Sequence, residues 1–161
     1  TAWSDSTTRE YPQAASDDGY IYNHEYGNNA DSSAITASIT SANISLDEGD
    51  RYVLLQRIIP DIDFTGSDVG TTPTVEFKVT AKKFPGSASY STNEAGTSTD
   101  GSVTAANEVA SATATVDEFT NQIYIRARGN QMAFTVESTA SGVAWGLGTP
   151  RADVRPDGRR G

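Results

Sequence analysis

Residues 122–137, with the sequence QIYIRARGNQMAFTVE, decide the fold class, because two runs of alternating apolar and polar side chains flank Gly129-Asn130. The apolar positions are Ile123, Ile125 and Ala127 in the first run and Met132, Phe134 and Val136 in the second. A period of two is typical of a β-strand, and glycine at the start of a two-residue loop favours a type II′ turn. The sequence therefore predicts a hairpin that pairs Ala127 with Met132 and places all six apolar side chains on one face.

The same alternation recurs along the chain. After the turn residues 140–142, Val143, Trp145 and Leu147 repeat the period of two, which predicts a third strand extending this sheet. Further strands are predicted near residues 20–26, 34–46, 52–59, 75–82 and 112–116, and Pro60 ends the most apolar of them. No segment shows a sustained helical period. We therefore expect an all-β chain of antiparallel sheets, sandwich-like or propeller-type, with extended N- and C-terminal arms.

Composition divides the chain into three regions. Residues 1–18 are polar and predict an extended arm, and residues 19–148 predict the antiparallel β domain. Within that domain, residues 87–108 are rich in Ser, Thr, Gly and Asn and predict a long exposed loop. Residues 149–161 form an Arg- and Pro-rich C-terminal arm, in which Pro150 and Pro156 should prevent regular strand pairing. No apolar run is long enough for a membrane span.

Charge is distributed unevenly. The net charge is −9, yet residues 121–161 hold six Arg against three Asp and Glu, whereas residues 1–120 hold six Lys and Arg against 18 Asp and Glu. An acidic body repels phosphate, so a groove that grips nucleic acid is disfavoured, while a channel through which DNA slides is allowed. Hydrophobic residues make up only 36% of the chain, so burial against a partner is plausible. The C-terminal arginines predict either a solvated tail or an extended arm that docks on an acidic neighbouring surface through Arg–carboxylate pairs.

The sequence offers no strong catalytic or metal-binding motif. His24 is the single histidine and cysteine is absent, so a conventional zinc site is excluded. Asp61 to Asp68 begin like a calcium loop, but Thr72 stands where a bidentate Glu is required, and an acidic turn is the better interpretation. Gly146-Leu147-Gly148 lacks the third glycine of a dinucleotide fingerprint. We expect no enzymatic activity, no cofactor and no metal.

Several patches together resemble a known family. They are Tyr22-Asn23-His24-Glu25-Tyr26-Gly27, Arg57-Ile58-Ile59-Pro60-Asp61, Phe84-Pro85-Gly86, Arg126-Ala127-Arg128-Gly129, Val136-Glu137-Ser138, Leu147-Gly148-Thr149-Pro150-Arg151 and Arg155-Pro156-Asp157-Gly158-Arg159-Arg160. In this order they resemble the C-terminal region of the tail nozzle proteins, also called stabilisation or tail tubular proteins, of tailed bacteriophages. Nozzle subunits are much longer than 161 residues, and this chain does not begin with Met, so we expect it to correspond to their last part.

The resemblance implies a structural protein of the virion. Subunits of this family are β-rich, often propeller-like, and assemble as a ring at the distal end of the tail, through which DNA leaves the particle. The expected partners are copies of the same chain, a hexamer by the resemblance, together with other tail proteins, and DNA passes without sequence-specific binding. We predict inter-subunit contacts at Arg126, Arg128, Arg151, Arg155, Arg159 and Arg160.

The alternative hypothesis is a carbohydrate-binding β-sandwich for host-surface attachment. Its platform for stacking sugars would consist of Trp3, Tyr20, Tyr22, Tyr26 and Trp145. Aromatic rings with a polar end suit such a site, although in strands they more often serve a core or an interface. Paired carboxylates are numerous, but nothing selects a pair for glycoside hydrolysis, which ranks third.

Overall fold

A computed structural model describes residues 2–5, 10–45, 51–82 and 111–159, with side chains at 111 and 159 excepted. Within these ranges every regular element is a strand, and all strand pairs are antiparallel, which confirms the predicted all-β class. The described residues contain no helix long and apolar enough to cross a membrane. The predicted loop at 87–108 lies outside the described residues.

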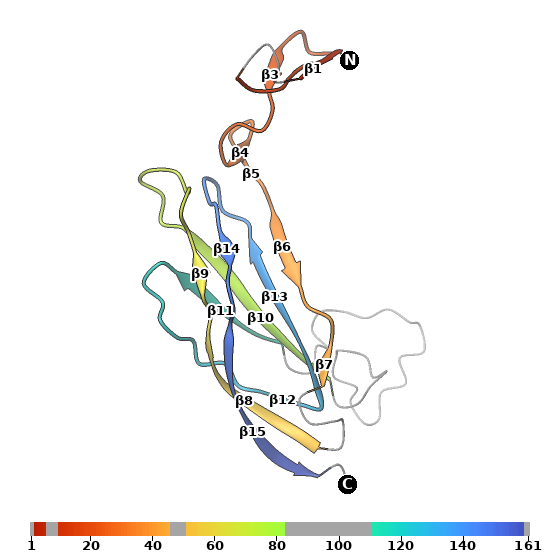
Figure 1. Cartoon of the computed structure of the whole chain (residues 1–161), viewed down its shortest axis with the longest axis vertical. Helices are drawn as coiled ribbons and strands as arrows, with labels where there is room; N and C mark the ends of the chain where they lie inside the picture. Colours follow the sequence, from red (N-terminus) through yellow and green to blue (C-terminus); the bar gives the residue numbers. More distant parts are fainter. Residues whose placement is uncertain (1, 6–9, 46–50, 83–110, 160–161) are drawn as a thin grey trace, which may run out of the picture.

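The strands fall into a small N-terminal group and a larger body (Figure 1). The N-terminal group contains β1 (Ala2–Ser4), β2 (Gln13–Ala15), β3 (Ile21–Asn23), β4 (Asn29–Ala30) and β5 (Ser33–Ala34). The body contains β6 (Ala37–Thr40), β7 (Ile44–Ser45), β8 (Arg51–Ile59), β9 (Ile62–Asp63), β10 (Thr74–Lys82), β11 (Ser111–Asp117), β12 (Ala127–Gly129), β13 (Gln131–Ser138), β14 (Gly146–Leu147) and β15 (Arg151–Arg159).

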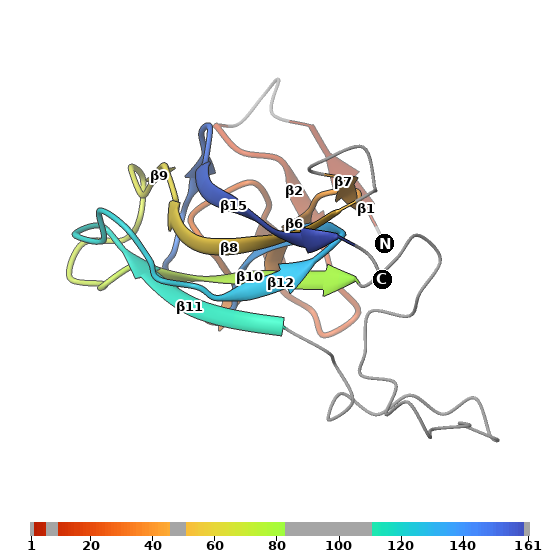
Figure 2. The same ribbon diagram turned by 90° about the horizontal axis from the view of Figure 1, so that it is seen from below.

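The body is a β-sandwich. Its larger sheet has the order β11-β10-β13-β6, with β7 also paired to β13, and its smaller sheet has the order β12-β8-β15. Viewed along the molecule, β8 and β15 form one layer over β10 (Figure 2). The core between the layers is made by Val53, Leu55, Ile58, Phe64, Val75, Phe77, Val79, Ala81, Val116, Ile123, Ile125, Ala127, Met132 and Val136.

Strand β10 shows how the sequence pattern sets the layers. Its odd-numbered residues, Val75, Phe77, Val79 and Ala81, are buried, while Glu76 is exposed on the opposite face. The register places Phe77 opposite Val136 and Val79 opposite Phe134, so neighbouring strands present their apolar side chains to the same core. The predicted strand at 75–82, with a charged outer face, is confirmed.

The predicted hairpin at 122–137 is wrong in its pairing, although its apolar face is buried. Ala127 lies opposite Leu55 on β8, and Met132 lies opposite Ala81 on β10, so the two runs belong to different sheets. Gly129 does not adopt the positive φ of a II′ turn, and the Asn130 N–H donates to the Lys82 carbonyl at 2.8 Å. The chain therefore crosses from the smaller sheet to the larger sheet here. Each run pairs with a nine-residue apolar strand, β8 or β10, which is longer than the other half of the predicted hairpin.

The third predicted strand is also displaced. Gly146–Leu147 form β14, which pairs with β9 and not with β13. Val143, Trp145 and Leu147 are partly buried and pack against the sandwich core, as their apolar side chains favour. The Gly148 N–H donates to the Asp61 carbonyl at 2.9 Å, which keeps this segment beside the chain that leaves β8.

The C-terminal segment is a strand of the smaller sheet, so the expectation that its prolines prevent pairing is wrong. Residues 151–159 form β15 along β8, with irregular register after Asp153 and after Pro156. Pro156 lies opposite Val53, and β15 is the edge strand of its sheet. A proline lacks the N–H that a central strand needs, but an edge strand leaves one side without ladder bonds.

The predicted N-terminal arm is also folded where the structure describes it. Strands β1, β2 and β3 form a three-stranded sheet, which stands beyond one end of the sandwich (Figure 1). A chain segment carrying the β4-β5 hairpin connects this sheet to β6. We call β1 to β5 and their connections, residues 2–5 and 10–36, the N-terminal module.

Candidate functional site

The predicted contact residues gather on the outer surface of the smaller sheet. Residues 123, 125 and 127 face the core, so Arg126 and Arg128 project outward, and Arg151 and Arg155 on β15 are exposed as well. The surface also carries Arg57, Asp153 and Asp157. We call these seven residues, five Arg and two Asp, the arginine face. Its excess of positive charge contrasts with the chain's net charge of −9.

Arg128 is held by contacts within the chain. Its Nε forms an ion pair with Asp157, its terminal nitrogen donates to the Asp157 carbonyl at 3.1 Å, and its guanidinium lies 4.6 Å from the centre of the Tyr52 ring. A guanidinium can pair with a carboxylate through its edge and stack on an aromatic ring through its face. The contacts of Arg128 with Asp157 and Tyr52 lie within its own chain.

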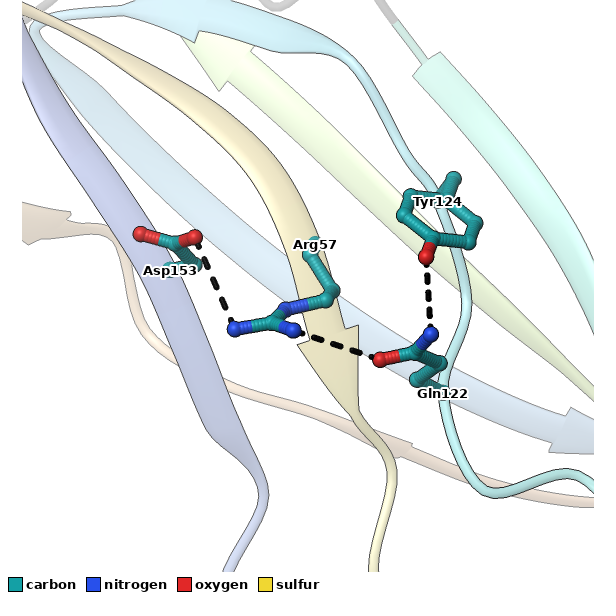
Figure 3. Close-up of polar contacts among 4 residues, drawn as sticks. All are labelled: Arg57, Gln122, Tyr124 and Asp153. Atoms are coloured by element: carbon teal, nitrogen blue, oxygen red, sulfur yellow. Dashed lines mark hydrogen bonds and ion pairs between the residues drawn. The ribbon is translucent and has the colours of Figure 1, made fainter.

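Arg57 on β8 connects β15 and the segment that precedes β12 through a series of polar contacts (Figure 3). Its guanidinium lies 3.7 Å from the Asp153 carboxylate and donates to Gln122 Oε1 at 3.3 Å. Gln122 Nε2 in turn donates to the Tyr124 hydroxyl at 2.7 Å. These side chains are exposed, so the pairs contribute little stability and mainly fix where the groups lie.

Arg126 and Arg155 flank an open cavity on this face. Its volume is about 510 Å³, and its lining consists of Gln56, Arg57, Tyr124, Arg126, Asp153 and Arg155. Across the described part of the chain, Arg126 and Arg155 form no ion pair, whereas Arg57 forms one with Asp153. Two unsatisfied guanidinium groups beside one cavity make a site for carboxylate or another anion.

The remaining predicted contacts differ in position. Arg151 lies on β15 opposite Ile59, near the start of the strand, and Arg159 lies opposite Arg51 at its far end. Arg160 lies outside the described residues. The structure thus brings Arg126, Arg128, Arg151 and Arg155 to one sheet surface and places Arg159 at its margin.

Sequence reasoning missed Arg57, for a physical reason. In a regular strand Arg57 would share the inward parity of Val53 and Leu55. The register of β8 with β15 skips Gln56, because Leu55 pairs with Val154 and Arg57 pairs with Asp153. This bulge turns Arg57 outward and buries Ile58 instead. The adjacent apolar pair Ile58-Ile59, which breaks the alternation, is the available signal.

A second cavity lies in the N-terminal module. It has a volume of about 750 Å³ and is lined by β2, β3 and the β4-β5 hairpin, with Tyr22, His24, Glu25, Tyr26 and Asp31 among its residues. Trp3, Tyr20 and Tyr26 are 60 to 68% exposed. Four members of the predicted sugar platform therefore lie in this module. The fifth, Trp145, packs partly buried against the sandwich core.

Hydrogen bonds shift the pKa values of two groups in this module, Asp18 and Tyr22. The Tyr22 hydroxyl donates to Asp18 Oδ2 at 2.7 Å. This bond, together with the one from the Tyr20 N–H, lowers the pKa of Asp18 below its ordinary value, and the bond to Asp18 raises the pKa of Tyr22. Both shifts favour the forms that an aspartate and a tyrosine already have at neutral pH, so the bond stabilises the anionic Asp18 beside the neutral Tyr22.

The remaining candidate residues take part in local contacts. The exposed His24 ring lies 5.0 Å from the Trp3 ring, centre to centre. In the acidic turn, Asp61 Oδ2 accepts from the Thr149 N–H at 2.6 Å, Asp63 Oδ1 accepts from the Thr65 N–H at 2.9 Å, and Asp68 accepts from Asn28 and Asn29. Within the described ranges, no three His, Asp or Glu groups converge as metal ligands.

Comparison of the sequence with protein-family models gives no match, and comparison with curated proteins gives none either. The arginine face and the cavity of the N-terminal module are therefore the two candidate functional surfaces.

Proposed function

We propose that this chain is a structural virion protein of a bacteriophage tail and forms part of a ring-shaped nozzle through which DNA exits. The observation that carries the proposal is the arginine face on an otherwise acidic chain, where Arg126 and Arg155 line an open cavity and form no ion pair with any residue that the structure describes. Opposite charges concentrated on different surfaces steer identical subunits toward each other and fix their orientation. The chain then works by assembly, and without a catalytic step.

Two further points support this function. The ordered motifs that end in Arg155-Pro156-Asp157-Gly158-Arg159-Arg160 resemble nozzle proteins. The net charge of −9 suits a wall along which DNA moves, because an acidic wall repels phosphate and prevents tight binding.

Electron cryo-microscopy of purified phage particles tests the proposal. We expect the sandwich to repeat around the axis of the distal tail, in a closed ring. Mass photometry of the purified chain should show an oligomer of defined size. If the chain is absent from particles and remains a monomer at high concentration, the proposal is wrong.

A second candidate function, carbohydrate binding for host attachment, has one specific observation in its favour. The cavity of the N-terminal module combines exposed rings with carboxylate and amide groups, the chemistry that stacks on a sugar ring and hydrogen-bonds its hydroxyls. Titration with host surface polysaccharide tests it. Tyr26→Ala should abolish binding, whereas Phe119→Ala, which removes an exposed ring far along the chain, should leave it unchanged.

A further inference from the structure

The N-terminal module carries the charge opposite to that of the arginine face. Residues 1–36 hold six carboxylates, Asp5, Glu10, Asp17, Asp18, Glu25 and Asp31, against Arg9 as the one Arg or Lys. Asp18 accepts a hydrogen bond from the Tyr22 hydroxyl at 2.7 Å, which lowers its pKa below the ordinary value. Asp17 accepts a hydrogen bond from the Ser16 hydroxyl at 3.2 Å, a neutral contact that leaves its charge uncompensated. The module therefore carries a net negative charge.

The module also exposes aromatic rings beside its carboxylates. Trp3 and Tyr26 are each packed against one ring, His24 and Tyr11 respectively, in tilted or edge-on pairs, and both remain more than half exposed. Carboxylates and open ring faces are the two groups to which arginine binds best. Within this chain, Arg128 already contacts both kinds of group, Asp157 and Tyr52.

The module and the arginine face lie on different parts of one molecule. Figure 1 shows β1 and β3 beyond one end of the sandwich, whereas β12, β8 and β15 extend toward the opposite end, where the C-terminus lies. Two complementary surfaces that are separated in this way join different copies, head to tail. Such a heterologous contact builds a ring when the rotation between neighbouring copies closes, and an open filament when it does not.

We propose that the arginine face of one copy binds the acidic and aromatic N-terminal module of the next copy. This inference rests on the proposed function and names the two surfaces that would build the ring. Arg126 and Arg155, beside their cavity, receive carboxylates of the neighbouring module, and its exposed rings stack on the arginine face. The contact buries rings that the free chain leaves in water.

Charge reversal on each surface tests the pairing. Arg126→Glu with Arg155→Glu makes the face acidic, and Glu10→Lys with Asp17→Lys makes the module less acidic, while Asp18 and its bond to Tyr22 stay intact. Each double variant should raise the dissociation constant of self-association roughly tenfold or more, because like charges then face each other. Sedimentation velocity of the full chain measures this constant.

Combining the two charge reversals, in a mixture or in one chain, provides the decisive test. An equimolar mixture of the two double variants restores opposite charges at every junction of an alternating, even-numbered ring. A chain that carries all four substitutions restores them in a ring of any size. We expect both samples to regain assembly. Glu76→Lys with Glu118→Lys is the matched control for the module variant, because it replaces two carboxylates by lysines on the sandwich. It should assemble like the wild type.

Three outcomes would overturn the inference. If either double variant assembles like the wild type and keeps its thermal midpoint, the ring uses other surfaces, and the proposed function survives. Failure of both the mixture and the quadruple variant to assemble, with all variants folded, overturns the pairing in the same way. A wild-type chain that stays monomeric at high concentration overturns the inference, and if it is also absent from phage particles the proposed function is wrong as well.

Discussion

The sandwich and the N-terminal module obtain their structure from different interactions. The sandwich encloses a core of fourteen buried apolar side chains between two sheets. In the described part of the module only Pro12 is buried, and its strands are joined by short ladders, ring contacts and the Asp18–Tyr22 hydrogen bond. Buried apolar area is the main source of stability, so the sandwich should fold by itself and the module should open locally. A module with so little core gains most from a partner.

The largest effect is expected in the sandwich core. Phe77 is 1% exposed and packs against the Phe134 ring at 6.3 Å, centre to centre. Phe77→Ala should lower the free energy of unfolding by about 3–5 kcal/mol, because the lost burial leaves a cavity between the sheets. Urea denaturation followed by circular dichroism measures this. Tyr20→Ala, a ring 68% exposed in the module, is the matched control and should leave the midpoint unchanged.

A second substitution acts where the chain crosses between the two sheets. A Cβ atom at Gly129 would lie 2.7 Å from the Lys82 carbonyl oxygen, a backbone atom that also accepts from the Asn130 N–H. Gly129→Ala should therefore cost about 1–3 kcal/mol, since two backbone segments must separate. Gly146→Ala has open space and serves as the control. Equal thermal midpoints for the two variants would show that the crossing tolerates a methyl group.

The third prediction concerns the connection between the two regions. Asp68 accepts hydrogen bonds from Asn28 Nδ2 at 2.9 Å and from Asn29 Nδ2 at 3.2 Å, and the Gly142 N–H donates to Asn29 Oδ1 at 2.7 Å. Asp68→Ala removes both bonds to the carboxylate, and we expect about 1 kcal/mol of local stability to be lost. Amide hydrogen exchange should accelerate in the module but not in β10.

The neighbouring Val69 provides the control for this prediction. It is fully exposed in the same loop, so Val69→Ala should leave exchange in the module as in the wild type. If Asp68→Ala accelerates exchange in β10 as well, the loop is part of the sandwich's cooperative unit and the two regions are less independent than their contacts indicate.

Regular alternation predicted much of the sandwich but not its pairing. For β8, β10 and β11, each predicted run is a strand, because a period of two places one face in the core wherever a sheet forms. The partner of each run depends on tertiary contacts. Residues 123–129 contain the signals of a hairpin, yet they pair with β8, a nine-residue strand that offers a longer apolar surface.

Irregular positions explain the remaining errors at the candidate site. The bulge at Gln56 turned Arg57 outward, and an edge position allowed Pro156 to join β15, so neither followed from local residue preferences. The outward direction of Arg126 and Arg128 follows from the alternation itself, because Ile125 and Ala127 between and beside them are buried. The partner surface in the module was missed, since four of its six carboxylates were assigned to an extended arm and the other two, Glu25 and Asp31, to the β domain.

The smallest effect is expected from acid, and it should separate the two regions again. The bond from Tyr22 lowers the pKa of Asp18 in the folded module relative to the unfolded chain. A depressed folded pKa stabilises the module above the unfolded pKa, and this contribution is lost as pH falls through the folded value, below about pH 4. Amide protection at β3 should therefore be constant between pH 7 and pH 5 and decrease below pH 4.

Asp18→Asn removes the titrating group and tests the assignment. Its protection at β3 should be lower than that of the wild type at neutral pH, with a smaller further loss on acidification. Asp17→Asn, at the adjacent position, should behave like the wild type. The sandwich has its own hydrogen-bonded carboxylates, since Thr65 and Thr120 lower the pKa values of Asp63 and Asp117. Its amides on β10 should nevertheless stay protected at pH 4, because the apolar core does not titrate.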